Sequence, residues 1–421
     1  MSTLSVNGRD YRLPRRPVVV VCIDGSEPAY FEDALARGLL PHLARFRAEG
    51  FYGTADCVVP SFTNPNNLSI VTGAPPALHG IAGNFFLDPD TGAEVMMNEP
   101  RFLRAGSILA ALSQTGCRVA VVTAKDKLRR LLGHGLRGPD RRGVCFSAEQ
   151  AHEATLAEHG IEGVNALLGR ETPDVYSAAL SEFVMEAGVR LLERDRPDVM
   201  YLSTTDYIQH KHAPGDPVSD AFYTALDAAW GRLAELGAVV GLTADHGMNA
   251  KNTAAGAPNV IYLSPLLEQW LGAGRARVIL PITDPYVLHH GALGSFATVY
   301  LRDGAARAED AGAALERLRA LPGIEYAAGR AEACARFELP PDRMGDLVVV
   351  SDRGTVLGKA PADHDLTQLE GGLRSHGGLA EQRVPFVLSA PLRPDYLARA
   401  TDPARRLRNF DLFDFALNGV A

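Results

Sequence analysis

The sequence has few of the features that mark secreted or membrane-spanning proteins. Its cysteines are odd in number and form no Cys-x-x-Cys pair, so neither a disulfide framework nor a thiolate zinc site is indicated. No apolar run reaches transmembrane length, and residues 1–10 hold no hydrophobic signal segment. We therefore expect a cytoplasmic protein without a membrane partner, whose free thiols are buried: Cys22, Cys57, Cys117, Cys145 and Cys334.

Basic residues are also fewer than acidic ones, 42 against 50. The formal net charge is -8, and the Arg-rich piece 125–142 is local rather than part of a basic stripe, which argues against nucleic-acid binding. Hydrophobic residues make up 46% of the chain and charged residues 22%, as in ordinary globular proteins. A chain of 421 residues can bury a large core and carry an insertion.

Strand-like and helical patterns alternate through the first 250 residues. Continuous apolar runs, typical of strands buried on both faces, alternate with amphipathic patterns typical of helices. This alternation predicts an α/β fold with a mostly parallel sheet. The expected strands are 17–23, 118–123, 197–203 and 238–243, and the expected helices are 40–49, 107–115, 177–194 and 219–236.

The pattern changes after about Asn252. A strand, a helix and a short strand are expected at 296–301, 306–321 and 324–327, followed by two strands that flank the turn 352–354 as a hairpin. The chain then rejoins the α/β core with an expected strand at 384–389 and a last helix at 409–418. We predict a core formed by 14–255 and 365–421, with an inserted α+β cap domain at 256–364.

Acidic residues follow three of the expected buried strands. They are Asp24, Asp206 and Asp245, the last with His246 beside it. In open α/β sheets this edge binds ligands, although a single Asp there often only caps the next helix. His210 would share a helical face with Asp206, and Asp with His suits a divalent cation such as zinc.

A further histidine must come from a distant segment. His376 is the best placed, because it lies in a Gly-rich loop shortly before the strand at 384–389. His212, beside the turn 213–215, and the pair His289-His290 are alternatives.

The segment 60–68 offers a nucleophile. It follows the strand-like stretch 52–59, and Thr63 comes just before Asn64-Pro65, where proline favours the first turn of a helix. A hydroxyl there faces unpaired backbone N–H groups and the positive end of the helix dipole, a setting that favours an alkoxide or a phosphoryl group. The alternative is that Thr63 is only a helix cap.

Two lysines and an asparagine could bind substrate. Lys125 and Lys127 follow the strand 118–123, and in an extended stretch both would point the same way, toward the ligand edge. A solvated basic turn is the alternative, since Arg129-Arg130 come next. Asn84 lies in a turn-like segment, where it could equally be a turn residue.

The ordered set Asp24-Gly25, Thr63, Asp206-x-x-x-His210, Asp245-His246-Gly247 and His376-Gly377 resembles the alkaline phosphatase superfamily, most closely its nucleotide pyrophosphatase/phosphodiesterase branch. The resemblance extends over nearly the whole chain. It implies a three-layer α/β sandwich with a mostly parallel central sheet and a smaller inserted cap. It also implies two zinc ions per subunit.

The resemblance implies a role for each residue. One zinc would be held by Asp206, His210 and His376, and the other by Asp24, Asp245, His246 and the Thr63 hydroxyl. Thr63 would be the nucleophile, Asn84 would bind a phosphoryl oxygen, and Lys125 and Lys127 would bind a carboxylate and stabilise an enolate. The substrate would contact Thr63, Asn84, Lys125, Lys127, His210 and His376.

The expected reaction is hydrolysis of the phosphorus–carbon bond of phosphonoacetate to acetate and phosphate, through a phosphothreonine. A nucleotide pyrophosphatase or phosphodiesterase is the alternative, with Phe62, Phe85 and Phe86 near a slot for a base. An inactive relative is disfavoured because every ligand is present, and a mutase because no serine nucleophile stands in its expected context. The partner would be a small phosphonate, and a homodimer is possible. Manganese or iron could take the place of zinc, because Asp/His sites accept several metals.

Overall fold

The structure is a computed structural model that describes residues 3–136, 143–284, 291–302, 307–367, 369 and 371–421. Its centre is a seven-stranded sheet in the order β4-β19-β10-β3-β9-β7-β8. The strands are β3 (Val18–Cys22), β4 (Phe51–Asp56), β7 (Val119–Thr123), β8 (Gly143–Ser147), β9 (Val199–Ser203), β10 (Val239–Thr243) and β19 (Arg383–Leu388).

The sheet is mostly parallel, as the sequence predicts. β3 pairs in parallel with β10 and β9, and β9 with β7, whereas β19 runs antiparallel to β10 and to β4. Alternate side chains of β3 enter different cores: Val19 and Val21 pack on one face, and Val18 and Val20 on the other. A strand buried on both faces needs the continuous apolar run that the sequence shows.

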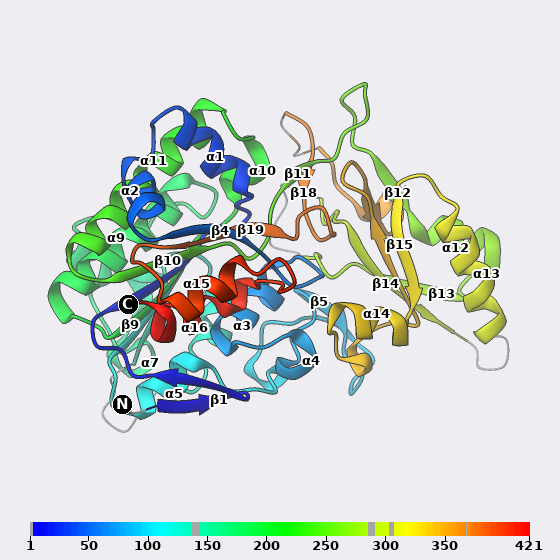
Figure 1. Cartoon of the computed structure of the whole chain (residues 1–421). Helices are drawn as coiled ribbons and strands as arrows, with labels where there is room; N and C mark the ends of the chain where they lie inside the picture. The colour runs from blue at the N-terminus through cyan, green and yellow to red at the C-terminus, as the bar shows by residue number, and fades with distance from the viewer. Residues whose placement is uncertain (1–2, 137–142, 285–290, 303–306, 368, 370) are drawn as a thin grey trace.

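Helices cover both faces of this sheet (Figure 1). One face carries α1 (Pro28–Ala36), α2 (Pro41–Glu49), α8 (Val164–Leu168), α9 (Ala178–Asp195) and α11 (Pro217–Glu235). The other carries α3 (Thr63–Thr72), α5 (Ile108–Gln114), α6 (Asp126–Leu132) and α16 (Leu412–Asp414). The predicted three-layer α/β sandwich is confirmed.

A second, four-stranded sheet lies beside the first (Figure 1). Its order is β13-β14-β16-β15, and each neighbouring pair is antiparallel. The bounds are β13 (Ala276–Ile279), β14 (Phe296–Leu301), β15 (Ile324–Gly329) and β16 (Leu347–Ser351), with α12 (Leu263–Leu271), α13 (Arg307–Arg319) and α14 (Arg330–Phe337) packed against them. All these elements fall within 256–364; the exact division into a core and a cap stays a prediction.

The hairpin predicted around residues 352–354 is wrong. The turn forms, with the Gly354 N–H donating to Asp352 Oδ1 over 3.0 Å, but the flanking strands belong to different sheets. β16 pairs with β14 and β15, whereas β17 (Val356–Gly358) pairs in parallel with β12 (Val260–Tyr262). Local turn chemistry cannot reveal this choice, because apolar strands pair with whichever partner buries them.

The last predicted helix is confirmed, but it combines three types of helical turn. Residues 409–419 form a 3-10 turn (Asn409–Asp411), α16 and a π-helical turn (Phe415–Gly419) in succession. Strands β1 (Thr3–Val6) and β2 (Arg9–Arg12) form a hairpin that the sequence reasoning missed. Smaller pairs are β5 (Phe85–Leu87) with β6 (Glu94–Met96), and β11 (Asn249–Ala250) with β18 (Arg374–Ser375).

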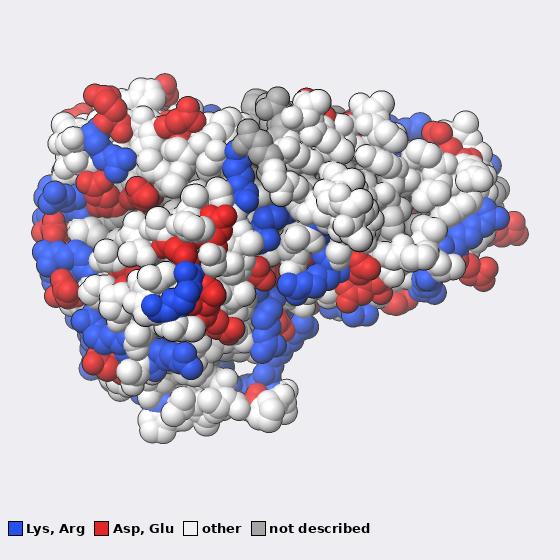
Figure 2. Space-filling view, turned by 90° about the horizontal axis from the view of Figure 1, so that it is seen from above, with Lys and Arg blue, Asp and Glu red and all other residues white. Residues whose placement is uncertain are grey.

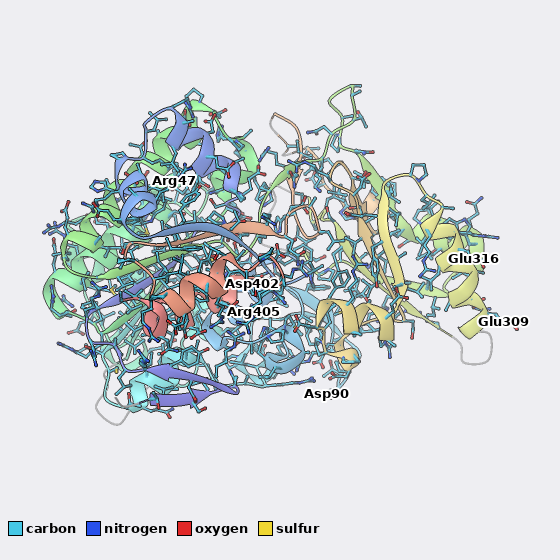
Figure 3. All side chains as sticks on the ribbon, viewed as in Figure 1. Arg47, Asp90, Glu309, Glu316, Asp402 and Arg405 are labelled. Atoms are coloured by element: carbon cyan, nitrogen blue, oxygen red, sulfur yellow. The ribbon has the colours of Figure 1, made fainter. Side chains whose placement is uncertain are left out.

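The remaining helices are short connectors or lie at the surface: α4 (Pro76–His79), α7 (Leu156–His159), α10 (Tyr207–Lys211) and α15 (Pro394–Thr401). Acidic and basic side chains intermix over the larger part of the face shown in Figure 2. The labelled Arg47, Glu309 and Glu316 lie on the outside of the ribbon, while other side chains fill the space between sheet and helices (Figure 3). Within the described ranges, no helix is long and apolar enough to cross a membrane.

Candidate functional site

Three neighbouring strands bring the acidic residues together. β10, β3 and β9 lie side by side in parallel register, so their carboxyl ends meet at one edge. Asp245, Asp24 and Asp206 each follow one of these ends and are buried. The i, i+4 spacing then brings His210 back from α10, with its Nε2 2.9 Å from Asp206 Oδ2. The edge predicted from the sequence is therefore where these groups converge.

Two groups of ligand atoms are close enough to hold a metal ion. Asp206, His210 and His376 form one group, and Asp24, Asp206 and His246 form the other. Within each group the ligand atoms lie within 4.8 Å of one another. Asp206 belongs to both, so the two candidate positions are adjacent.

All three imidazoles are oriented by backbone carbonyls. His210 Nδ1 contacts Arg374 O at 2.8 Å, His246 Nδ1 contacts Gly247 O at 2.9 Å, and His376 Nδ1 contacts Ser61 O at 2.8 Å. A carbonyl oxygen can only accept, so each Nδ1 carries the proton. Each Nε2 then faces the carboxylates and is the ring atom that could bind a metal ion, which is the orientation of metal-ligating histidines.

The pKa shifts of the buried side chains indicate that a bound cation would stabilise this cluster. Burial raises the pKa of Asp24 well above its ordinary value, and the Asp206 and Asp245 carboxylates raise it further. Burial alone would lower the pKa of His246, but Asp245 and Asp24 raise it to about 10. Burial and the His246 and His210 rings lower the pKa of His376. Carboxylates this close together are stable as anions only beside a cation.

The residues present fit divalent metal ions. Asp24 Oδ1 and His246 Nε2 are buried and have no hydrogen-bond partner among the described residues, although they lie 3.2 Å apart. Buried polar atoms without partners are rare in folded proteins. Carboxylate oxygens and imidazole nitrogens together suit zinc and similar borderline cations.

Asp245 is held differently from the other carboxylates. Its Oδ1 accepts from the backbone N–H groups of Gly25 (3.2 Å) and His246 (3.0 Å), and its Oδ2 accepts from Asn67 Nδ2 (3.1 Å). The same Oδ2 lies 3.9 Å from His246 Nε2, so Asp245 borders the second group.

Thr63 is the first residue of α3 rather than a capping residue. Phe62 precedes the helix, and no side chain caps it. Thr63 instead lines a pocket together with Asp24, Asp206 and His376. The helix ends at Gly73, which adopts φ +64°. The capping interpretation therefore fails, and Thr63 lies beside the metal-ligand groups at the positive end of the helix.

Asn84 lines the same pocket and is buried. Its Oδ1 accepts from the Asn64 N–H at the start of α3 over 2.9 Å. This hydrogen bond satisfies one of the N–H groups that have no partner within the helix. Because it uses the Asn84 Oδ1, the Asn84 Nδ2 donor points away from the helix.

Lys125 and Lys127 both line this pocket, but not through an extended stretch. Lys125 is the residue before α6, and Lys127 lies in its first turn. The predicted strand-like geometry is wrong, because the Asp126 N–H is capped by Glu149 Oε2 over 2.7 Å and the helix begins there. The solvated-turn interpretation also fails, since Arg129 is buried against Asp126.

Asp284 is a pocket residue that the sequence reasoning missed. It is buried, lies after β13, and forms an ion pair with Lys127. Burial and then Lys125 lower the pKa of Lys127 to about 7. The Asp206, Asp24 and Glu149 carboxylates oppose that shift. No local pattern marks Asp284, because its role depends on how the second sheet meets the first.

Asn67 and Thr204 also support the site without having been predicted. Asn67 Oδ1 accepts from Tyr201 and Ser203, and its Nδ2 holds Asp245. Thr204 Oγ1 accepts from the Asp24 N–H over 3.0 Å. The polar run Asn64-Pro65-Asn66-Asn67 in an otherwise buried helix was a usable signal.

The alternative residues lie elsewhere. His212 Nδ1 pairs with Asp216 Oδ2 at 3.2 Å, outside both ligand groups. His289 and His290 lie outside the described residues. Phe62 packs against His376 with ring centroids 5.5 Å apart, and Phe86 against Phe102 at 4.9 Å. Neither these rings nor Phe85 lines the pocket.

Comparisons with known proteins agree with this geometry. The chain is 56% identical to phosphonoacetate hydrolase from Sinorhizobium meliloti 1021 in complex with phosphonoformate, with a TM-score of 0.94 and all of both chains covered. The same hydrolase in complex with phosphonoacetate matches at 55% identity with a TM-score of 0.93, again over all of both chains.

More distant proteins share the fold. Murine ectonucleotide pyrophosphatase / phosphodiesterase 5 matches at 18% identity and a TM-score of 0.63, covering 95% of this chain and 94% of that one. An uncharacterized pyrophosphatase/phosphodiesterase of Schizosaccharomyces pombe is 36% identical over 86 residues, which span 20% of this chain and 16% of that relative.

The family comparison covers most of the chain. The model of the type I phosphodiesterase / nucleotide pyrophosphatase family matches residues 18–378, which include Asp24, Asp206, Asp245, Thr63 and both pocket lysines. The chain belongs to the type I phosphodiesterase / nucleotide pyrophosphatase family.

Proposed function

We propose that this protein hydrolyses phosphonoacetate to acetate and phosphate. The observation that carries the proposal is the pocket itself, where Lys125, Lys127 and Thr63 lie together with three members of the candidate metal-ligand groups, Asp24, Asp206 and His376. Full-length similarity to phosphonoacetate hydrolase, at 55% and 56% identity, supports it. A phosphonate group would face the ligands, and the carboxylate of the same molecule would face the lysines.

The metal centre is proposed to hold two zinc ions per subunit. One would be bound by Asp206, His210 and His376, and the other by Asp24, Asp245, His246 and the Thr63 hydroxyl. When bound, the ions would supply the positive charge that lowers the pKa of the Thr63 hydroxyl and neutralises the phosphonate oxygens.

The first chemical step is assigned to Thr63. Its oxygen would attack phosphorus, forming the O–P bond of a phosphothreonine while the P–C bond breaks and its electron pair moves to the CH₂ carbon. The Asn84 Nδ2 group would donate to a phosphonate oxygen.

The leaving group is stabilised by the lysines. The electron pair on the CH₂ carbon delocalises into the carboxylate as an enolate, and the ammonium groups of Lys125 and Lys127 would hold that added charge. Protonation of the carbon yields acetate. Water then hydrolyses the phosphothreonine, releasing phosphate and restoring the Thr63 hydroxyl.

A nucleotide pyrophosphatase or phosphodiesterase of the same family is the second candidate, favoured by the family match. Such an enzyme needs a surface on which a base can stack. The phenylalanines considered for it face the protein interior or lie away from the pocket. The lysine pair suits a carboxylate better than a base.

The test is product analysis with purified, zinc-loaded protein. Phosphate and acetate should appear in equal amounts from phosphonoacetate, at a rate well above hydrolysis of a nitrophenyl phosphodiester. Faster turnover of the diester, with no phosphate from phosphonoacetate, would replace this proposal by the second candidate. Manganese- and iron-loaded samples would identify the metal, and sedimentation would decide whether the proposed homodimer forms. A cytoplasmic location remains part of the proposal.

A further inference from the structure

A fully buried ion pair lies behind the candidate metal centre. Lys251 Nζ and Glu381 Oε1 are 2.9 Å apart, and both side chains are 0% exposed. Lys251 directly follows β11, and Glu381 lies in the loop between β18 and β19. Apolar residues of similar size are often at least as stabilising as a buried ion pair, so stability alone is a weak reason for this one.

Glu381 contacts both loops that carry metal-ligand imidazoles. Its Oε2 accepts from the Gly378 N–H over 3.0 Å, two residues after His376. Its backbone oxygen accepts from the Gly247 N–H over 2.7 Å, one residue after His246. One residue therefore ties together two loops that are far apart in the sequence.

These contacts reach the carbonyls that orient the rings. The Gly247 carbonyl accepts from His246 Nδ1. For His376 the connection runs through Ser61, whose Oγ donates to Gly378 O over 2.9 Å and whose carbonyl accepts from His376 Nδ1. The two rings are stacked, with centroids 3.6 Å apart and planes at 7°, so a shift of either loop would move one ring against the other.

Lys251 extends the connection to the second sheet. Its Nζ donates to the Arg353 carbonyl over 2.9 Å, in the turn that follows β16. From the same side, the Ser295 N–H just before β14 donates to His376 O over 2.8 Å. The four-stranded sheet is thus attached to the ligand loops through buried polar contacts.

We propose that the Lys251–Glu381 pair is a positioning element that fixes His246 and His376 against each other and thereby sets the affinity of the site for its divalent metal. Neither residue reaches the pocket, so they act through the loops rather than on substrate. The inference rests on the proposed metal centre.

The test measures zinc affinity of the full-length protein by competition with a chelator, which is a readout independent of turnover. Glu381→Asp keeps the charge for Lys251 but shortens the side chain, withdrawing the acceptor from Gly378. We expect its zinc affinity to fall about 10- to 100-fold, as for other residues that orient metal ligands. Lys251→Met should lower affinity as well.

A matched control separates positioning from simple loss of stability. Val349→Ala opens space in buried β16 without touching either loop. It should lower the unfolding temperature of metal-free and metal-loaded protein alike and leave zinc affinity unchanged. Should Glu381→Asp fail to fold, Asn249→Ala removes one donor to Glu381 Oε1 and should lower affinity a few-fold while keeping the ion pair.

The outcomes are distinct. Wild-type zinc affinity in a folded Glu381→Asp or Lys251→Met protein would overturn the inference while leaving the proposed function intact. An equal loss of affinity in Val349→Ala would reduce the pair to a stabilising contact. A wild-type protein that binds neither zinc, manganese nor iron would overturn the proposed metal centre and this inference with it.

Discussion

The two walls of the pocket are built in different ways. The metal-ligand wall comes from the ends of three adjacent parallel strands, and backbone carbonyls orient its imidazoles. The lysine wall comes from the start of α6, one strand further along, and its second lysine pairs with Asp284 from beside the other sheet. One wall is set by the sheet itself, and the other by how two sheets meet.

This difference assigns the two walls different roles. A metal-ligand wall can serve any phosphoryl transfer, because it acts on charge around phosphorus. In the proposed reaction the lysine wall would select the leaving group, because two ammonium groups would stabilise the negative charge of a carboxylated one. Substitutions on the two walls should therefore differ in size and in substrate dependence.

Thr63→Ala should have the largest effect, at the junction of the walls. Loss of the proposed nucleophile should reduce kcat by about 10³-fold or more, since a nucleophile and its activating groups act as one unit. Zinc content should stay close to that of the wild type, because Asp and His ligands remain. Phosphate release and elemental analysis measure the two quantities. Thr63→Ser is the matched control and should keep substantial activity; turnover by Thr63→Ala would remove Thr63 from the chemistry.

Lys125→Met and Lys127→Met should each lower kcat/KM for phosphonoacetate by about 10²-fold, because each removes a charge that is proposed to stabilise the developing enolate. Hydrolysis of a nitrophenyl phosphate, which has no carboxylate, should change far less. Steady-state kinetics on both substrates measure the difference. An equal loss on both would mean that the lysines belong functionally to the metal-ligand wall.

The lysine wall should also give the activity a pH limit. The pKa of Lys127 is lowered to about 7 by burial and by Lys125, so the side chain is cationic below that pH and neutral above it. Because the cation would stabilise the leaving group in the proposed reaction, kcat/KM for phosphonoacetate should fall as pH rises through about 7. In Lys127→Met, this fall in kcat/KM with rising pH should disappear. An unchanged fall in that variant would assign it to another group.

Asp284→Asn should move the fall in kcat/KM to lower pH. The Asp284 carboxylate favours the charged form of Lys127, so its removal should lower the Lys127 pKa further and shift the fall in kcat/KM to lower pH. The expected shift is about one pH unit, with little change at pH values well below the fall. A shift to higher pH would contradict the pairing.

His212→Ala should have the smallest effect. The ring pairs with Asp216 at the surface and belongs to neither ligand group, so activity and zinc content should stay within about two-fold of the wild type, as is usual for partly exposed pairs. Loss of one zinc in this variant would instead make His212 a ligand.

Several features of the site could be predicted from the sequence for simple physical reasons. Apolar runs identify strands buried on both faces, and parallel strands share one ligand edge, so the sequence alone places Asp24, Asp206 and Asp245 together. The i, i+4 spacing does the same for His210. Asp284 and the Lys251–Glu381 pair could not be predicted, because no shared strand edge or helical spacing links the paired residues, which are 157 and 130 positions apart in the chain.

The sequence by itself determined the alternation of strands and helices, the ligand edge and the residue types that meet there, because these depend on periodicity and strand order. The tertiary structure alone decided which sheet received β16 and which received β17, since both are short apolar runs beside the same turn. It also decided that Lys127 faces a buried carboxylate and that one buried glutamate holds two histidine loops. Contacts of this kind depend on long-range packing, which leaves no periodic trace in the chain.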